Sequence, residues 1–275
     1  MTRHNDHDDF GGLQRDLRAT GAAMDRRSVL RLAARFGGAM SALQLLGCGG
    51  TATAPSSAST TSTTAANGAC SVIPNETQGP FPGDGSNGPN VLSLTGVVRS
   101  DIRPSFAGLS GTADGVPLTI ALTIVSASTC APLAGRAVYL WECDSAGRYS
   151  LYSAGATNQN YLRGVQAADA DGKVTFTAVY PGCYAGRWPH IHFEVYPSLA
   201  AATNVANKIA TSQIALPKSA SDAVYATAAY NGSAANLSRV TLATDGIFSD
   251  GSSLELATVT GSVPGGFTAT LTVGI

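Results

Sequence analysis

Two histidines separated by a single residue are the side chains of this 275-residue sequence best suited to chemistry. The sequence has four histidines, and His4 and His7 lie ahead of a segment that reads as an export signal, so the exported part would keep only His190 and His192. Imidazole is the commonest metal ligand in proteins. The pair therefore predicts a metal site, and the alternative is a half-buried polar face satisfied by hydrogen bonds.

The spacing of this pair determines where the two imidazoles point. If residues 190–196 form a strand, its period of two sends His190 and His192 to one face. Ile191 and Phe193 then point to the opposite face. Two nitrogen ligands would converge on one side of a sheet.

Two tyrosines offer oxygen donors close to the histidines. Tyr184 lies six residues before His190 and follows Pro181-Gly182, a turn signal that could swing its phenol toward the histidine face. Tyr149 comes just after another predicted strand. Two phenolates and two imidazoles combine hard anionic oxygen with nitrogen, and this set favours a hard trivalent cation. We therefore expect ferric iron, Fe(3+), rather than zinc or copper(I), and oxidative chemistry.

The composition narrows the classes of partner. Charged residues make up 13% of the sequence, hydrophobic residues 44%, and the net charge is -1. Proteins that bind nucleic acid usually carry a basic patch or stripe, which this balance does not provide. We therefore expect no nucleic-acid partner.

Two segments precede the predicted domain. Residues 1–48 resemble a twin-arginine signal peptide, with Arg26-Arg27 ahead of an apolar stretch and a lipobox-like sequence before Cys48. A transmembrane helix is the weaker alternative, because the apolar stretch is shorter than about 20 residues. Residues 49–69 are almost entirely Gly, Ala, Ser, Thr and Pro, a composition typical of a flexible linker. We expect export to the periplasm or cell envelope, a lipid anchor at Cys48, and one folded domain over residues 70–275.

Four cysteines fall within the predicted domain: Cys70, Cys130, Cys143 and Cys183. In an oxidising compartment an even number predicts disulfides, and three pairings are open. We favour Cys143 with Cys183, because each lies close to a tyrosine of the predicted metal site, and this leaves Cys70 with Cys130. Thiolate binding of a metal is the alternative, but no Cys-x-x-Cys spacing supports it.

The rest of the predicted domain reads as strands nearly throughout. Short apolar or β-branched runs are separated by Gly, Pro, Asp and Asn, which predicts an all-β fold, a β-sandwich with few short helices. The best helix candidate is Ser219–Ala229, and residues 261–266 predict a hairpin turn. The predicted strands are Val91–Val98, Leu118–Val125, Ala137–Trp141, Val174–Val179, Ile191–Val195, Leu254–Thr260 and Phe267–Val273.

A series of short motifs extends along this domain. It comprises ETQGPF at 76–81, Trp141 followed by GRY at 147–149, LRG at 162–164, DADG at 169–172, PG-x-Y at 181–184, Arg187 and HIHF at 190–193. This combination resembles the intradiol ring-cleavage dioxygenases, the family of protocatechuate and catechol dioxygenases. The resemblance implies a β-sandwich of the intradiol dioxygenase type with a non-haem ferric centre.

The resemblance also implies a role for each matching ligand. Tyr149 would be the permanent phenolate ligand, and Tyr184 the ligand that leaves when a substrate chelates the metal. His190 and His192 would be the imidazole ligands. The segment from Tyr184 to Arg187 is short compared with the protocatechuate enzymes, so the resemblance does not specify the ring substituents.

The implied reaction is the cleavage of a catechol-type ring by O2 between its two hydroxylated carbons. Arg187 would stabilise the negative charge that develops on the bound ring. Gln213 matches, less closely, a glutamine that supports the site. The product would be a cis,cis-muconate-type diacid, and no organic cofactor would be needed.

Two other interpretations stay open. The domain could be a catalytically silent envelope lipoprotein that binds aryl compounds or carbohydrate. It could also be a zinc hydrolase, although the sequence has no acidic base at the His-Glu-x-x-His spacing. As a weaker alternative, the tyrosines and Arg187 could be ordinary strand and surface residues. The identity of the bound metal would distinguish a zinc hydrolase from a dioxygenase. Turnover of a catechol would distinguish a dioxygenase from a silent binding protein.

Overall fold

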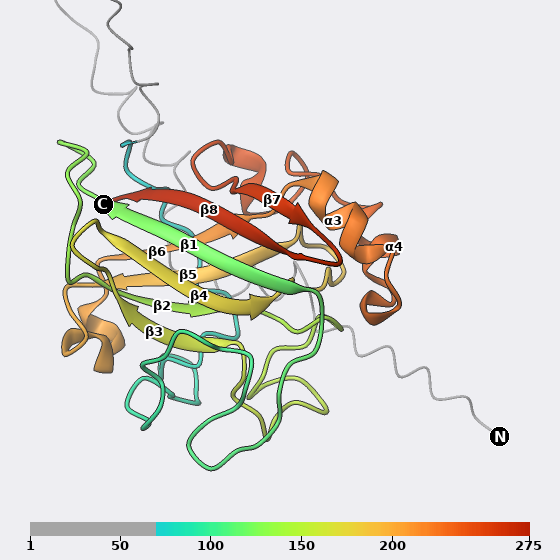
Figure 1. Ribbon diagram of the computed structural model, residues 1–275, viewed down its shortest axis with the longest axis horizontal. Helices are drawn as coiled ribbons and strands as arrows, with labels where there is room; N and C mark the ends of the chain where they lie inside the picture. The colour runs from blue at the N-terminus through green and yellow to red at the C-terminus, as the bar shows by residue number, and fades with distance from the viewer. Residues whose placement is uncertain (1–69) are drawn as a thin grey trace, which may run out of the picture. The chain divides into compact units, whose positions relative to one another are not determined.

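Residues 70–275 are the part of the chain that the computed structural model describes. They form two four-stranded sheets, with strand orders β4-β1-β8-β7 and β3-β2-β5-β6 (Figure 1). The prediction of an all-β sandwich with few short helices is confirmed. The predicted signal peptide, the lipid anchor at Cys48 and the predicted linker lie outside the described residues.

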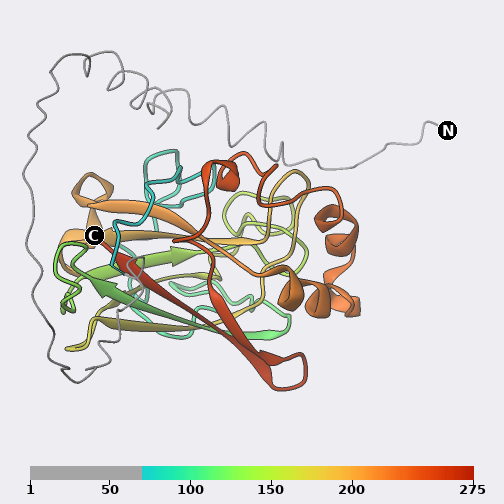
Figure 2. The same cartoon turned by 90° about the horizontal axis from the view of Figure 1, so that it is seen from above.

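The described part of the chain contains eight strands and six short helices. In chain order they are β1 (Pro117–Val125), β2 (Ala137–Trp141), β3 (Arg163–Ala167), β4 (Lys173–Val179), β5 (His190–Tyr196), η1 (Ala201–Thr203), η2 (Val205–Asn207), β6 (Ala210–Ala215), α3 (Lys218–Tyr225), η3 (Ala228–Tyr230), α4 (Ser233–Leu237), η4 (Phe248–Asp250), β7 (Thr258–Ser262) and β8 (Gly266–Gly274), where η marks a 3-10 helix. Figure 2 shows α3 and α4 together at one end of the strands. Within residues 70–275, none of the helices combines the length and apolar character needed to cross a bilayer.

Alternation along the strands builds the core between the sheets. In β1, Leu118 and Ile120 are buried, while Thr119 between them faces outward and is only partly covered. In β5, Ile191 and Phe193 belong to the same apolar cluster as the β1 side chains. This is the face assigned to them from sequence, so the opposite face of β5 is left to the histidines.

A second, smaller cluster covers the outer face of the sheet β3-β2-β5-β6. Tyr139 and Trp141 of β2 pack there with Tyr149 and with Phe81 from the segment before β1. Both histidines are also buried, with 2% of each exposed. Loops therefore close over this face of the sheet and keep its polar side chains out of water.

The predicted strand Val91–Val98 is wrong, because this segment forms turns that cover the second cluster. Gly96 has a φ of 94°, and a Cβ at this position would lie 3.4 Å from the Phe106 side chain. A left-handed glycine in the middle of the run breaks the extended backbone that its apolar residues suggested. Val91 and Leu92 are buried by the loop instead.

Other boundaries differ for recognisable reasons. Strand β7 begins at Thr258 rather than at Leu254, because residues 252–256 form a turn that is closed by hydrogen bonds to Ser252 O. Helix α3 ends at Tyr225, short of the predicted Ala229. Strands β3 and β6 were missed, because their sequences RGVQA and ATSQIA contain too few apolar residues to alternate clearly.

A disulfide joins Cys70 to Cys130 across a sequence separation of 60 residues, so this part of the predicted pairing is confirmed. It ties the start of the described chain to the loop after β1. The same segment runs beside the end of β8, where Ile73 N donates to Gly274 O at 2.8 Å. The start of the described chain is therefore held in place twice, by the disulfide and by a hydrogen bond to β8 of the first sheet.

The predicted Cys143–Cys183 disulfide is wrong, because both residues are free and buried thiols. Each sulfur lies 3.4 Å from a different backbone carbonyl, Gly182 O for Cys143 and Arg187 O for Cys183. Each thiol is thus held as a weak donor to its own acceptor. Burial raises the pKa of the Cys183 thiol to about 12, which disfavours the thiolate that metal binding needs.

Glu142 should make the protein less stable as the pH rises. It follows β2, only 1% of it is exposed, and neither carboxyl oxygen has a hydrogen-bond partner among the described residues. Burial raises its pKa well above the usual range, so the folded protein holds a proton that the unfolded chain releases near pH 4.3. The stability associated with Glu142 is therefore complete below that pH and is lost as the pH rises toward the folded pKa.

The matching measurement is urea unfolding of Glu142→Gln and of the wild type from pH 4.5 to pH 8. Glutamine has nearly the same shape and does not titrate, so the variant should gain free energy of unfolding relative to the wild type as the pH rises. The gap should widen by up to about 1.4 kcal/mol per pH unit. A gap that stays constant over this range would contradict the assignment of a neutral, buried Glu142.

Candidate metal centre

One row of side chains crosses the outer face of the sheet β3-β2-β5-β6. The register pairs Arg163 with Trp141, Trp141 with His192, and His192 with Gln213. Residues directly opposite each other on neighbouring strands point to the same face. The four side chains therefore stand side by side, which brings Gln213 next to a histidine that is 21 positions away in the sequence.

Two phenol oxygens and two imidazole nitrogens converge beside this row. His190 Nε2 lies 3.1 Å from His192 Nε2, 3.1 Å from Tyr184 Oη and 3.3 Å from Tyr149 Oη. Tyr149 Oη lies 3.2 Å from His192 Nε2. The structure thus brings together all four residues that the sequence predicted as metal ligands.

The hydrogen bonds of His190 fix which of its nitrogens carries the proton. Nδ1 lies 2.6 Å from the backbone carbonyl oxygen of Trp188, which can only accept. Nδ1 is therefore the protonated nitrogen, and Nε2 presents its lone pair to the other donor atoms. Burial, followed by the nearby charge of Arg187, lowers the pKa of His190 well below its usual value, so the imidazole is neutral.

The ring of His192 is held by stacking. It lies almost parallel to the indole of Trp141, with ring centroids 4.9 Å apart and an interplanar angle of 6°. Its Nδ1 is buried and has no hydrogen-bond partner within residues 70–275. Burial lowers the pKa of His192 well below its usual value, and the nearby charge of Arg187 adds to this effect. Both imidazoles are therefore in the neutral form that binds metals.

The two tyrosines differ in how firmly they are enclosed. Tyr149 is 1% exposed, its ring packs 4.9 Å from that of Phe81, and its backbone N donates to Ser153 Oγ. Tyr184 is only partly buried, and the next two residues, Ala185 and Gly186, are exposed. One phenol is thus locked in the interior, whereas the other belongs to a turn at the surface.

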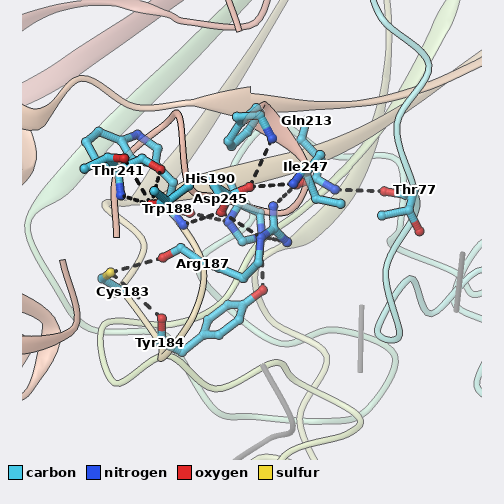
Figure 3. Close-up of polar contacts among 12 residues, drawn as sticks. Thr77, Cys183, Tyr184, Arg187, Trp188, His190, Gln213, Thr241, Asp245 and Ile247 are labelled. Carbon is cyan, nitrogen blue, oxygen red and sulfur yellow. Dashed lines mark hydrogen bonds and ion pairs between the residues drawn. The ribbon is translucent and has the colours of Figure 1, made fainter. Parts of the chain in front are cut away.

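Arg187 is completely buried and extends into the same site. Figure 3 shows its guanidinium between Asp245, Gln213 and His190. Its Nε donates to Asp245 Oδ2 at 3.0 Å, its Nη2 donates to Gln213 Oε1 at 2.6 Å, and its Nη1 lies 3.4 Å from His190 Nε2. Gln213 Nε2 in turn donates to the carbonyl of Thr77, in the ETQGPF segment. Gln213, which matched the family only weakly in sequence, is therefore in direct contact with Arg187.

Sequence reasoning missed two contributors. Asp245 lies 58 residues beyond Arg187 in a Thr-Asp-Gly turn, which is an ordinary loop signal. Arg163 was noted only as part of a motif, yet it is fully buried and donates to the carbonyls of Phe81 and Pro82. These bonds fix the ETQGPF segment above Tyr149, and no local pattern encodes such distant contacts.

The four donor atoms fit a single metal ion. Neighbouring atoms lie 3.1–3.3 Å apart, and this separation suits ligands that share an ion at the distances of about 2.0–2.2 Å usual for nitrogen and oxygen. Within residues 70–275, no group of three or more His, Cys, Asp or Glu side chains could hold a metal ion. A metal ion bound beside the two histidines would therefore also need the phenol oxygens, and phenol oxygen with imidazole suits ferric iron.

Comparisons with known proteins agree with this geometry. A family model described as Dioxygenase matches residues 99–203, a range that includes all four donor residues and Arg187. An intradiol ring-cleavage dioxygenase from Tetranychus urticae is 25% identical, covers 75% of this chain and 94% of its own, and superposes with a TM-score of 0.57. The crystal structure of another dioxygenase is 24% identical and also covers 75% of this chain and 94% of its own. Its TM-score of 0.59 shows that the two chains share the fold.

A search of the curated proteins finds no match. The match to the dioxygenase family model ends ten residues before Gln213, so it covers neither this residue nor Asp245. It does cover strands β1 to β5, which carry the core and both histidines. The sandwich, the motifs on its outer face, the family model over residues 99–203 and the Tetranychus urticae structure all make the chain similar to one family, the intradiol ring-cleavage dioxygenases.

Proposed function

We propose that the protein is an Fe(3+)-dependent dioxygenase that cleaves a catechol-type ring between its two hydroxylated carbons. In this proposal Tyr149, Tyr184, His190 and His192 hold the iron. The convergence of two phenol oxygens and two neutral imidazoles within 3.1–3.3 Å carries the proposal. The substrates are a catechol-type aromatic and O2, and the product is a cis,cis-muconate-type diacid.

The chemistry that ferric iron supplies when bound is chelation of both catechol oxygens, a lowered pKa of the two hydroxyls, and withdrawal of electron density from the ring. Tyr184 is suited to leave the site when the substrate enters, because it lies on a surface turn and is only partly buried. Once released, its phenolate oxygen would accept a proton from the catechol. Tyr149 is enclosed by packing and would stay in place.

Arg187 would act on the charge that develops on the ring. Its guanidinium is fully buried and fixed by hydrogen bonds on two sides, so it would need no rearrangement during the reaction. Gln213 would hold the Nη2 end of Arg187, and through Thr77 it would link this end to the ETQGPF segment. Both residues would therefore stabilise the transition state more than the bound substrate.

We also propose that the domain acts outside the cytoplasm, anchored through Cys48. The Cys70–Cys130 disulfide supports this, because disulfides persist mainly in oxidising compartments. Fractionation of cells that express the full chain, with Cys48→Ser as the control, is the direct measurement. Loss of the membrane-bound fraction in the variant is the expected result, and soluble wild-type protein would contradict the anchor.

The test of the activity is a visible spectrum of the purified protein, supplied with iron, before and after catechol is added without oxygen. The wild type should show a broad phenolate-to-iron band that shifts with catechol and fades once oxygen enters, while a muconate-type product accumulates. A protein that binds catechol without forming product would point to the silent binding protein. A colourless protein that retains zinc in preference to iron would point to the hydrolase.

A further inference from the structure

Asp245 has more hydrogen bonds than a carboxylate that merely shapes a loop. It is completely buried, and its Oδ1 accepts from the backbone N–H groups of Ile247 and Phe248 at 2.8 and 3.1 Å. Its Oδ2 accepts from Arg187 Nε at 3.0 Å and from the backbone N–H of Trp188 at 2.7 Å. Oδ1 therefore organises the loop after residue 245. Oδ2 holds the side chain of Arg187 and the backbone of Trp188.

Arg187 depends on this contact for its direction. The Nε end is fixed by Asp245, the Nη2 end is fixed by Gln213, and Nη1 is left facing His190 Nε2. The ring of Phe248 lies 5.9 Å from the guanidinium carbon. Because Asp245 also fixes the backbone of Phe248, one carboxylate sets both the direction of the guanidinium and the aromatic wall beside it.

Asp245 also supplies the opposite charge. The Arg187–Asp245 ion pair has both side chains fully buried. Removing one partner from such a pair leaves an uncompensated charge in a medium of low dielectric constant. An unpaired guanidinium next to two neutral imidazoles would turn toward solvent or another acceptor, and Nη1 would no longer face the site.

We propose that Asp245 is a positioning residue of the reaction: its carboxylate aims the charged Arg187 guanidinium at the substrate position and so determines the turnover rate without touching substrate or metal. This inference rests on the proposed dioxygenase function. The effect should appear in kcat, because the charge that Arg187 meets develops only after the substrate has bound. Partners that orient a metal-site residue typically affect activity by 10- to 100-fold.

The first variant is Asp245→Asn, which keeps the shape and one oxygen acceptor. An amide can face the loop N–H groups or the Arg187 side with its oxygen, but not both. We expect kcat to fall by about 10- to 100-fold with little change in KM, while the phenolate-to-iron band of the resting protein stays as in the wild type. Asp245→Glu, which keeps the charge, should recover part of the loss.

Two control variants separate this effect from a loss of stability or of charge. Val224→Ala removes part of a fully buried side chain in α3 and lowers stability without touching the site. Asp222→Asn removes a carboxylate from the exposed Lys218–Asp222 pair. Both should keep the wild-type kcat. If Val224→Ala slows turnover as much as Asp245→Asn at matched stability, Asp245 acts through the fold and the inference is wrong.

A double-mutant cycle tests whether Asp245 acts through Arg187. If it does, adding Asp245→Asn to Arg187→Lys should slow turnover by less than threefold, because the group that Asp245 positions is already altered. An additive loss, in which Asp245→Asn costs the same factor in both backgrounds, would show that it does not act through Arg187.

A measurement on the metal-free protein keeps the test independent of activity. In a sample with 15N-labelled arginine, the Nε–H resonance that disappears in Arg187→Lys belongs to Arg187. Its exchange with water should be slow in the wild type and at least about tenfold faster in Asp245→Asn, since the hydrogen bond from this N–H to a charged acceptor is weakened. Fast exchange in the wild type would overturn the inference even if the protein cleaves catechol, whereas slow exchange without catechol cleavage would count against the proposed function alone.

Discussion

Replacing His192 with alanine should abolish iron binding and, with it, ring cleavage. His192 Nε2 is within 3.2 Å of both His190 Nε2 and Tyr149 Oη, so it lies next to two of the other three proposed ligands. Alanine would leave three donors and an empty space beside Trp141, which now stacks on the ring. Loss of an outer partner of a ligand costs about 10- to 100-fold in metal affinity, and loss of the ligand itself should exceed this range.

Metal analysis after dialysis against a weak chelator measures this result directly. The matched control is Ile191→Val, one residue away in the same strand but facing the core between the sheets. It should keep its iron and lose only about 0.5–1.5 kcal/mol of stability. His192→Ala protein that retains one equivalent of iron with wild-type colour would show that His192 is not a ligand.

Tyr184→Phe should leave a protein that binds iron with weaker colour and turns over far more slowly. Phenylalanine keeps the ring, which lies 5.6 Å from that of His190, and removes only the oxygen. Tyr184 is the donor that would leave when substrate enters, and the three donors that would stay in place remain, so iron should still bind. The phenolate oxygen that would accept the catechol proton is absent, and such proton transfers contribute about 10²- to 10⁴-fold to a rate. We expect kcat to fall within this range.

Stopped-flow absorbance with catechol under air, together with the resting spectrum, measures both effects. Tyr230→Phe is the matched control, because Tyr230 is buried and hydrogen-bonded to Tyr180 O but belongs to the core between the sheets. It should keep the wild-type colour and rate. An unchanged spectrum in Tyr184→Phe would exclude Tyr184 as a ligand, and an unchanged rate would exclude it as the proton acceptor.

Strands whose side chains alternate were predictable, because a period of two between a buried and a less buried face is visible in the letters themselves. The predicted Ala137–Trp141 agrees with β2, and residues 190–196 agree with β5. The segment Val91–Val98 misled, because apolar residues in a covering loop resemble a buried strand until the left-handed Gly96 is seen. Strand β6 was missed because its own sequence does not alternate clearly, and it is pairing with β5 that makes it a strand.

The sequence by itself determined which residue types are available as donors, that the two histidines share one face, and the resemblance to the dioxygenases, because these depend on residue identity and on spacing over a few residues. Only the tertiary structure decided which tyrosine is enclosed, that Cys143 and Cys183 are free thiols, and that Asp245 holds Arg187. These features depend on contacts between segments tens of residues apart. Strand register and loop packing create such contacts, and no local pattern in the sequence records them.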